Sequence, residues 1–123
     1  MGDNIKQATT EGKLRDFEAR VQALMRMGGT KQVQKQHDGG KLTARERLDR
    51  LFDKGSFQEV QLFVKHHAML FGMDKKDIPA DGVITGFGKV NGRIVFAAAQ
   101  DFTSAGGTLG EMHAKKIWKV MDM

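Results

Sequence analysis

The feature that most restricts the fold of this chain is a pair of β-rich runs in GVITGFGKVNGRIVFAAAQD, separated by Asn91 and Gly92. Asn-Gly is the dipeptide that favours the type I′ turn of a two-residue hairpin, because both of its residues tolerate a positive φ. The stretch therefore predicts an antiparallel hairpin. The second run, IVFAAAQD, is apolar on both faces, which predicts a strand buried between two layers.

Helical periodicity precedes the hairpin. Over residues 10–27, apolar side chains recur at spacings of three and four before two glycines end the pattern: Leu14, Phe17, Val21, Leu24 and Met25. The next segment, TKQVQKQHD, has only Val33 to bury, so we predict a short helix on the surface.

A third helix is predicted in LTARERLDRLF, where Thr43 and Glu46 have the spacing of a capping box. In this helix Leu48, Leu51 and Phe52 are expected to face inward. After Ser56 the apolar period changes from helical to two, which predicts a strand over residues 58–64. Glycine, aspartate and proline then indicate a long loop over residues 72–82.

The last segment returns to helical spacing. Thr108 and Glu111 have the spacing of a second capping box, and an apolar face follows it: Leu109, Met112, Ile117, Val120 and Met121. This face is still running at Met123 without a glycine cap. We therefore expect an α/β fold that is cut at this point, with helices first, then a hairpin and a helix, and about three strands.

Composition limits the functional classes. The 123 residues allow one domain at most, and the net charge of +5 with a pI near 9.6 suits a phosphate-bearing ligand, nucleic acid or an acidic surface. There is no cysteine, so disulfides and thiolate sites are excluded. No apolar run approaches the roughly 18 residues of a spanning helix, and the expected location is the cytoplasm, without membrane insertion.

Two stretches are candidates for anion binding. In DFTSAGGTLGE, Gly106 and Gly107 lead from a strand into a helix, a geometry that directs backbone N–H groups at an anion. No phosphate-loop or dinucleotide motif is present, so a plain tight turn is the favoured interpretation, and Phe102 is expected in the core. Lys41 and Arg45 lie four residues apart and suit one phosphate group, although a solvated helix face accounts for the same spacing.

The remaining motifs argue against catalysis by this segment. His37, His66 and His67 lack the spacing of a metal site, so no metal is predicted. There is no nucleophile elbow and no convincing acid–base pair, so no catalytic residue is predicted.

The stretches KQHDGGKLTARERLDRLFDKGSF and LFGMDKKDIPADGVITGFGKVNGRIVFAAAQDFTSAGGTLGEMHAKKI, and the closing KVMDM, resemble in their order the amino-terminal part of biotin-dependent acyl-CoA carboxyltransferase subunits. The resemblance implies a crotonase-like fold, with an amino-terminal helix over 1–27 and the start of the carboxyltransferase domain over 28–123. It also implies transfer of a carboxyl group between carboxybiotin and an acyl-CoA. The oxyanion-hole segments of the family lie further along the chain, so these 123 residues alone are expected to be inactive.

By the same resemblance, Lys41 and Arg45 lie near the CoA phosphates, and Gly106 and Gly107 border the acyl-CoA path. The implied partners are a biotin carboxyl carrier protein or biotin carboxylase subunit and further copies of the chain, without nucleic acid. Two departures from the family pattern are His67, where relatives carry arginine, and Ser104-Ala105, where they carry bulkier residues. A basic nucleic-acid-binding module that uses Lys41, Arg45, Arg47 and Arg50, or a non-catalytic assembly piece, is the alternative function.

Overall fold

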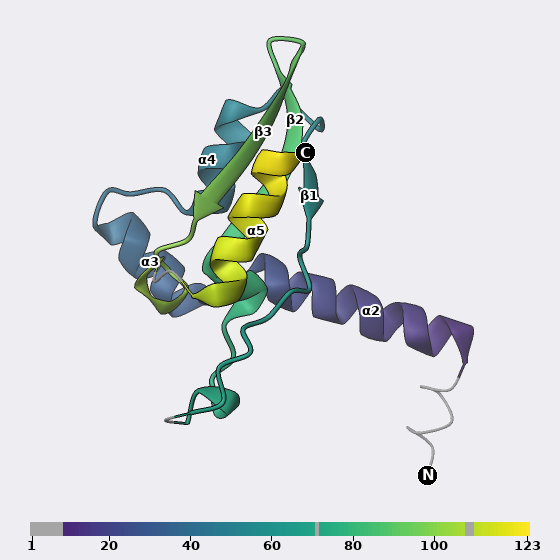
Figure 1. Cartoon of the computed structure of the whole chain (residues 1–123), viewed down its shortest axis with the longest axis vertical. Coiled ribbons are helices and arrows are strands. Elements are labelled where there is room, and N and C mark those ends of the chain that lie inside the picture. Colours follow the sequence, from purple (N-terminus) through teal and green to yellow (C-terminus); the bar gives the residue numbers. More distant parts are fainter. Residues whose placement is uncertain (1–8, 71, 108–109) are drawn as a thin grey trace.

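The computed structural model describes residues 9–70, 72–107 and 110–123 (Figure 1). The helices are α2 (Thr10–Met25), α3 (Thr30–Asp38), α4 (Ala44–Leu51) and α5 (Glu111–Asp122), and the strands are β1 (Gln58–Val60), β2 (Val83–Val90) and β3 (Arg93–Gln100). Three short 3₁₀ turns are η1 (Met73–Lys75), η2 (Pro79–Gly82) and η3 (Ala105–Gly107). The strands form one antiparallel sheet in the order β1-β2-β3, and both α4 and α5 pack against β2 and β3.

The predicted hairpin is confirmed. β2 and β3 pair along their whole length, from Val83 opposite Gln100 to Val90 opposite Arg93. The two turn residues have positive φ angles, 50° at Asn91 and 78° at Gly92, as a type I′ turn requires. The Asp53 carboxylate accepts hydrogen bonds from both turn amides, each at 2.9 Å, so the residues after α4 fix the hairpin tip.

The central strand is β2, and the prediction that the second run is buried on both faces is wrong. β3 forms an edge of the sheet, and its Ile94 and Phe96 are 68% and 42% exposed. An apolar pattern cannot tell which of two strands has a neighbour on each side. Glycine gives a better signal, because a Cβ at Gly86 of β2 would lie 2.2 Å from the Gln58 carbonyl oxygen of β1.

The α4 region forms the core beside the hairpin. The capping box is present: Thr43 Oγ1 accepts from the Glu46 amide at 3.2 Å, and the Glu46 carboxylate accepts from the Thr43 amide at 2.8 Å. Leu48 and Phe52 are buried in a cluster with Ile84 of β2. Leu51 is 48% exposed, so its predicted inward orientation is wrong.

Two other elements differ from the predicted ones. β1 ends at Val60 instead of residue 64, because Gln61 adopts a φ of 59° that an extended strand does not allow. α2 begins after an N-cap at Thr9 and buries only its carboxyl end at Leu24. Its Phe17 is about half exposed and contacts the ring of Phe63 at 5.5 Å between centroids. Figure 1 shows the amino-terminal half of α2 projecting from the rest of the molecule.

α5 starts later than predicted, and the face that it buries includes two basic side chains besides the predicted apolar ones. Its N-cap is Gly110, so the second capping box is wrong, and Thr108 itself lies outside the described residues. Val120 of the predicted apolar face is buried as expected, together with His113 and Lys116, whereas Met121 of that face is 77% exposed. A histidine and a lysine are therefore the groups that this helix presents to the sheet.

Candidate functional site

The segment after β3 is hydrogen-bonded to Gly28, which lies between α2 and α3. Asp101 is fully buried, and its carboxylate accepts hydrogen bonds from the backbone amide of Thr103 at 2.8 Å and from the Thr103 hydroxyl. The same hydroxyl accepts a hydrogen bond from the Gly28 amide at 3.3 Å. The tight turn that follows includes Gly106 in a left-handed conformation, with a φ of 66°. We call residues 101–107 the DFTSAGG loop.

Lys41 lies against this loop. Its ammonium nitrogen is 5.9 Å from the centroid of the Phe102 ring, a cation–π distance. Phe102 is 65% exposed, so its predicted place in the core is wrong. Both side chains border a shallow groove of about 200 Å³, with residues from α3 and the loop: Gln32, Lys35, Gln36, Gly39, Lys41, Phe102 and Thr103. The predicted Lys41 thus borders the first part of the DFTSAGG loop, and the predicted Gly106 and Gly107 lie further along the same loop.

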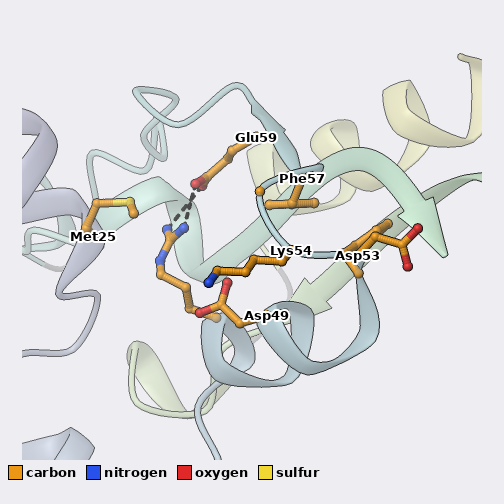
Figure 2. Close-up of a pocket in the computed structure, with 9 residues that line it drawn as sticks. Met25, Asp49, Asp53, Lys54, Phe57 and Glu59 are labelled. Atoms are coloured by element: carbon orange, nitrogen blue, oxygen red, sulfur yellow. Dashed lines mark hydrogen bonds and ion pairs between the residues drawn. The ribbon is translucent and has the colours of Figure 1, made fainter. Parts of the chain in front are cut away.

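Arg45 lies in a different place. Its guanidinium group donates two hydrogen bonds to the Glu59 carboxylate of β1, at 2.7 and 3.3 Å, and the two side chains are only 17% and 12% exposed. This pair lines a separate pocket of about 460 Å³, shown in Figure 2 with Met25, Phe57 and Glu59 around it. Lys41 precedes the Thr43 cap, so the spacing of a continuous helix does not apply to Lys41 and Arg45. The structure does not bring the two cations together.

The sequence patterns missed a buried polar cluster beneath the DFTSAGG loop. Lys116 Nζ donates hydrogen bonds to the carbonyl oxygens of Ala80 and Val83, at 2.7 and 2.6 Å. His113 Nδ1 lies 2.8 Å from the Asp81 carbonyl oxygen. Because a carbonyl only accepts, Nδ1 of His113 carries the proton in this contact. Neither His113 nor Lys116 has any exposed surface.

Burial shifts both of these basic groups toward their neutral forms. Desolvation lowers the pKa of Lys116 to about 8, although the Glu59 and Asp81 carboxylates oppose the shift. Desolvation also lowers the pKa of His113 below its ordinary value, against the opposing effect of its hydrogen bond to the Asp81 carbonyl. A histidine and a lysine three residues apart, within the apolar stripe of a helix, are the sequence signal that could have indicated this cluster.

The three histidines considered for a metal have other environments. His37 Nε2 lies 2.8 Å from a carboxylate oxygen of Glu46, and this contact is the main cause of the lowered Glu46 pKa. His66 Nε2 lies 2.7 Å from the Lys76 carbonyl oxygen. Within residues 9–70, 72–107 and 110–123, no three histidine, aspartate or glutamate side chains are grouped as metal ligands would be. Over the same residues, no helix has both the length and the apolar character needed to cross a membrane.

The sequence that forms these helices, this sheet and the DFTSAGG loop matches a known protein family. The model of the carboxyl transferase domain family matches residues 35–123, and the chain belongs to this family. The particular relatives are subunits of enzymes named for methylmalonyl-CoA and propionyl-CoA. Over 111 residues the chain is 54% identical to the methylmalonyl-CoA decarboxylase subunit alpha of Propionigenium modestum, and over 121 residues it is 49% identical to the methylmalonyl-CoA carboxyltransferase 12S subunit of Propionibacterium freudenreichii subsp. shermanii.

These matches cover 90% and 98% of this chain but only 22% and 23% of the two relatives. The chain thus spans less than a quarter of their length. Among solved structures, transcarboxylase 12S with methylmalonyl-coenzyme A and methylmalonic acid bound is similar with a TM-score of 0.91 and 49% identity, over 94% of this chain and 22% of that one. The predicted fold, part of a crotonase-like carboxyltransferase domain, is confirmed.

Proposed function

We propose that this chain forms the amino-terminal part of a carboxyltransferase that moves a carboxyl group between carboxybiotin and an acyl-CoA, with propionyl-CoA and methylmalonyl-CoA as the preferred pair. The observation that carries this proposal is the similarity to transcarboxylase 12S, which was solved with methylmalonyl-coenzyme A bound. The biotin is carried by a carrier protein or a biotin carboxylase subunit, and the working enzyme is a homo-oligomer in the cytoplasm.

The acyl-CoA contact that this chain offers is the groove between Lys41 and the DFTSAGG loop. An exposed ammonium group against Phe102, in the loop that also contains Gly106 and Gly107, suits a phosphorylated ligand, because cations and the backbone N–H groups of glycine turns both favour anions. Arg45 was expected beside Lys41. Its guanidinium group instead donates two hydrogen bonds to the Glu59 carboxylate, which takes the place that a phosphate group would have as its charge partner. We therefore propose Lys41, Gly106 and Gly107 as direct contacts and assign Arg45 a smaller share of CoA binding.

The chemistry itself is proposed to need residues outside this chain. In the DFTSAGG loop the Thr103 hydroxyl donates to the Asp101 carboxylate, but both side chains are buried and hold the loop itself, and the charged cluster of α5 is also fully buried. The chain alone is expected to bind CoA weakly and to exchange no carboxyl group. Transfer requires a longer product of the same gene.

The test combines an activity and a binding measurement. A longer product of the gene is incubated with methylmalonyl-CoA and free biotin, and carboxyl exchange is followed with a ¹⁴C label; its absence would refute the proposed reaction. In the same protein, Lys41→Ala should raise the KM for the acyl-CoA about tenfold with kcat little changed, because one charged contact is worth about 1.4 kcal/mol. Lys13→Ala, an exposed lysine on α2, is the matched control.

An assembly role has one specific observation in its favour. Large apolar side chains are exposed on each of three elements, α2, β3 and α5: Leu14, Phe17, Ile94, Phe96, Trp118 and Met121. Their number agrees with burial against further protein, and so with the proposed homo-oligomer. The basic nucleic-acid-binding alternative loses support, because Arg45 is paired with Glu59 instead of being free on a basic face.

A further inference from the structure

The turn between the long loop and β2 has an uncommon backbone. Ala80, Asp81 and Gly82 all have positive φ angles, of 51°, 51° and 70°. Such angles cost energy in residues other than glycine, so a run of them persists only where its surroundings hold it in place. Ala80 and Asp81 are nearly or completely buried, and the surroundings that hold them are the side chains of α5.

Two side chains of α5 bind the carbonyl oxygens of this turn at separate points. Lys116 reaches the oxygens of Ala80 and Val83, and His113 reaches that of Asp81, all at 2.6–2.8 Å. Three carbonyl groups of four successive residues therefore accept hydrogen bonds from one helix face. An apolar residue at position 113 or 116 would leave buried carbonyls without these donors.

The turn is in direct contact with the DFTSAGG loop. The Gly82 carbonyl accepts a hydrogen bond from the Asp101 amide at 2.9 Å. A Cβ at Gly82 would lie 3.5 Å from the Ser104 carbonyl oxygen and 3.6 Å from His113 Nδ1, so Gly82 is held between the loop and the α5 histidine. The Asp81 carboxylate lies on the other side, beside Gly110 at the positive end of the α5 dipole.

We propose that His113 and Lys116 are positioning residues that clamp the left-handed turn Ala80–Gly82 and, through Gly82, hold the DFTSAGG loop in the conformation that binds the acyl-CoA. The link to acyl-CoA rests on the proposed function, whereas the clamp rests on the hydrogen bonds alone. Neither side chain touches the ligand, since both are fully buried.

The clamp has a pH signature that simple packing does not have. The charged groups that act on Lys116 are Glu59 of β1, Asp81 of η2 and Arg45 of α4, and those that act on His113 are Asp81 and Lys116. The pKa of Lys116 is about 8 when the clamp is closed, and opening returns it to the ordinary 10.5. The equilibrium constant for opening of the Ala80–Gly82 turn is therefore largest below pH 8, and it falls as the pH rises toward 10.5. With these two values, the equilibrium constant for opening falls about 27-fold between pH 7 and pH 9.5.

The experiment is hydrogen exchange of the 123-residue chain, followed by mass spectrometry over peptides that cover residues 79–83 and 101–107. Exchange rates are corrected for the intrinsic effect of pH. We expect the wild type to show this rise in protection of about 27-fold, and Lys116→Met to exchange faster at pH 7 without that pH dependence. His113→Leu should also exchange faster, whereas His113→Asn, whose side-chain amide can replace Nδ1–H as a donor, should restore protection.

The outcomes separate the two proposals. Unchanged exchange of residues 101–107 in His113→Leu, or a flat pH profile in the wild type, would overturn the clamp; the wild-type profile decides even if both variants fail to fold.

Coenzyme A is then titrated into the same proteins by calorimetry. Binding that weakens at least fivefold in His113→Leu and recovers in His113→Asn supports the positioning role, and equal affinity in both variants would overturn it. A wild type that protects residues 101–107 as expected but binds no coenzyme A would contradict the proposed ligand site, together with the positioning role that rests on it, and leave the clamp itself intact.

Discussion

The contact between Gly28 and Thr103 joins the amino-terminal helices to the DFTSAGG loop, and it leaves no space for a side chain. A Cβ at residue 28 would lie 1.8 Å from the Thr103 carbonyl oxygen and 2.4 Å from its carbonyl carbon. Real Cβ atoms essentially never approach below 3.0 Å, so Gly28→Ala must separate the two backbones by more than 1 Å. Because both partners are backbone, no side-chain rotation can relieve the overlap.

The expected cost follows from what this separation disrupts. The Gly28 amide loses its 3.3 Å hydrogen bond to Thr103 Oγ1, worth about 1 kcal/mol. Overpacking of a tight contact adds about 1–3 kcal/mol. Met27, next in the chain and 5% exposed, also becomes partly hydrated. We therefore expect Gly28→Ala to lower the free energy of unfolding by about 2–4 kcal/mol, or to prevent folding altogether.

The assay is urea denaturation of the 123-residue chain at 25 °C, followed by circular dichroism. With a slope of about 1.5 kcal/mol per molar urea, the midpoint should fall by more than about 1 M. Gly39→Ala is the matched control, since a Cβ there would make ordinary contacts at 3.5 and 3.6 Å and its φ of −80° suits alanine. A midpoint for Gly28→Ala within about 0.3 M of the wild type would refute the Gly28–Thr103 contact.

Three further measurements test other parts of the structure. Thr43→Ala should lower the free energy of unfolding by about 1 kcal/mol, because the capping box loses its hydroxyl acceptor; a change below about 0.3 kcal/mol in the same urea assay would contradict the cap. Glu59→Gln should cost about 2 kcal/mol because it leaves the Arg45 guanidinium without its charge partner, and a double-mutant cycle with Arg45→Met should show a coupling of at least about 1 kcal/mol. Lys116 has a folded-state pKa of about 8, below its unfolded value, so its contribution to stability is largest above pH 10.5 and is lost as the pH falls through 8. The difference in unfolding free energy between wild type and Lys116→Met should therefore shift in favour of the wild type from pH 7 to pH 10, and a constant difference would show that Lys116 keeps an ordinary pKa.

Local chemistry made the hairpin and the α4 cap predictable. Asn91-Gly92 and Thr43 with Glu46 specify their conformations through residues at most three positions apart, and both features are present as expected. The edge position of β3 was not predictable in this way, because it depends on a pairing between β1 and β2 that is far apart in sequence. The spacing of apolar residues indicates which face of a strand is buried, but it does not indicate which other strand will pair with it.

The candidate site was predicted only in part, for a related reason. Lys41 and the DFTSAGG loop do come together, but the capped start of α4 turns Arg45 toward Glu59. The direction of the buried face of α5 was predicted from its apolar residues, but His113 and Lys116 within that face were not, because apolar periodicity does not include polar side chains. The surface that α5 covers is a turn whose buried carbonyl oxygens need hydrogen-bond donors, and His113 and Lys116 supply them.

The exposed β3 edge has a consequence for how this chain behaves in concentrated solution. No strand lies beyond β3 in the described sheet, so the N–H and C=O groups of alternate residues of β3, which point away from β2, are open to another backbone. The sequence of this strand after Arg93 is IVFAAAQ, which contains no charge, glycine or proline, and its Ile94 and Phe96 are exposed. Such a segment has the composition of strands that stack into cross-β aggregates. Isolated copies of this chain are therefore expected to associate edge to edge through β3. A segment or subunit that covers this strand would prevent such association.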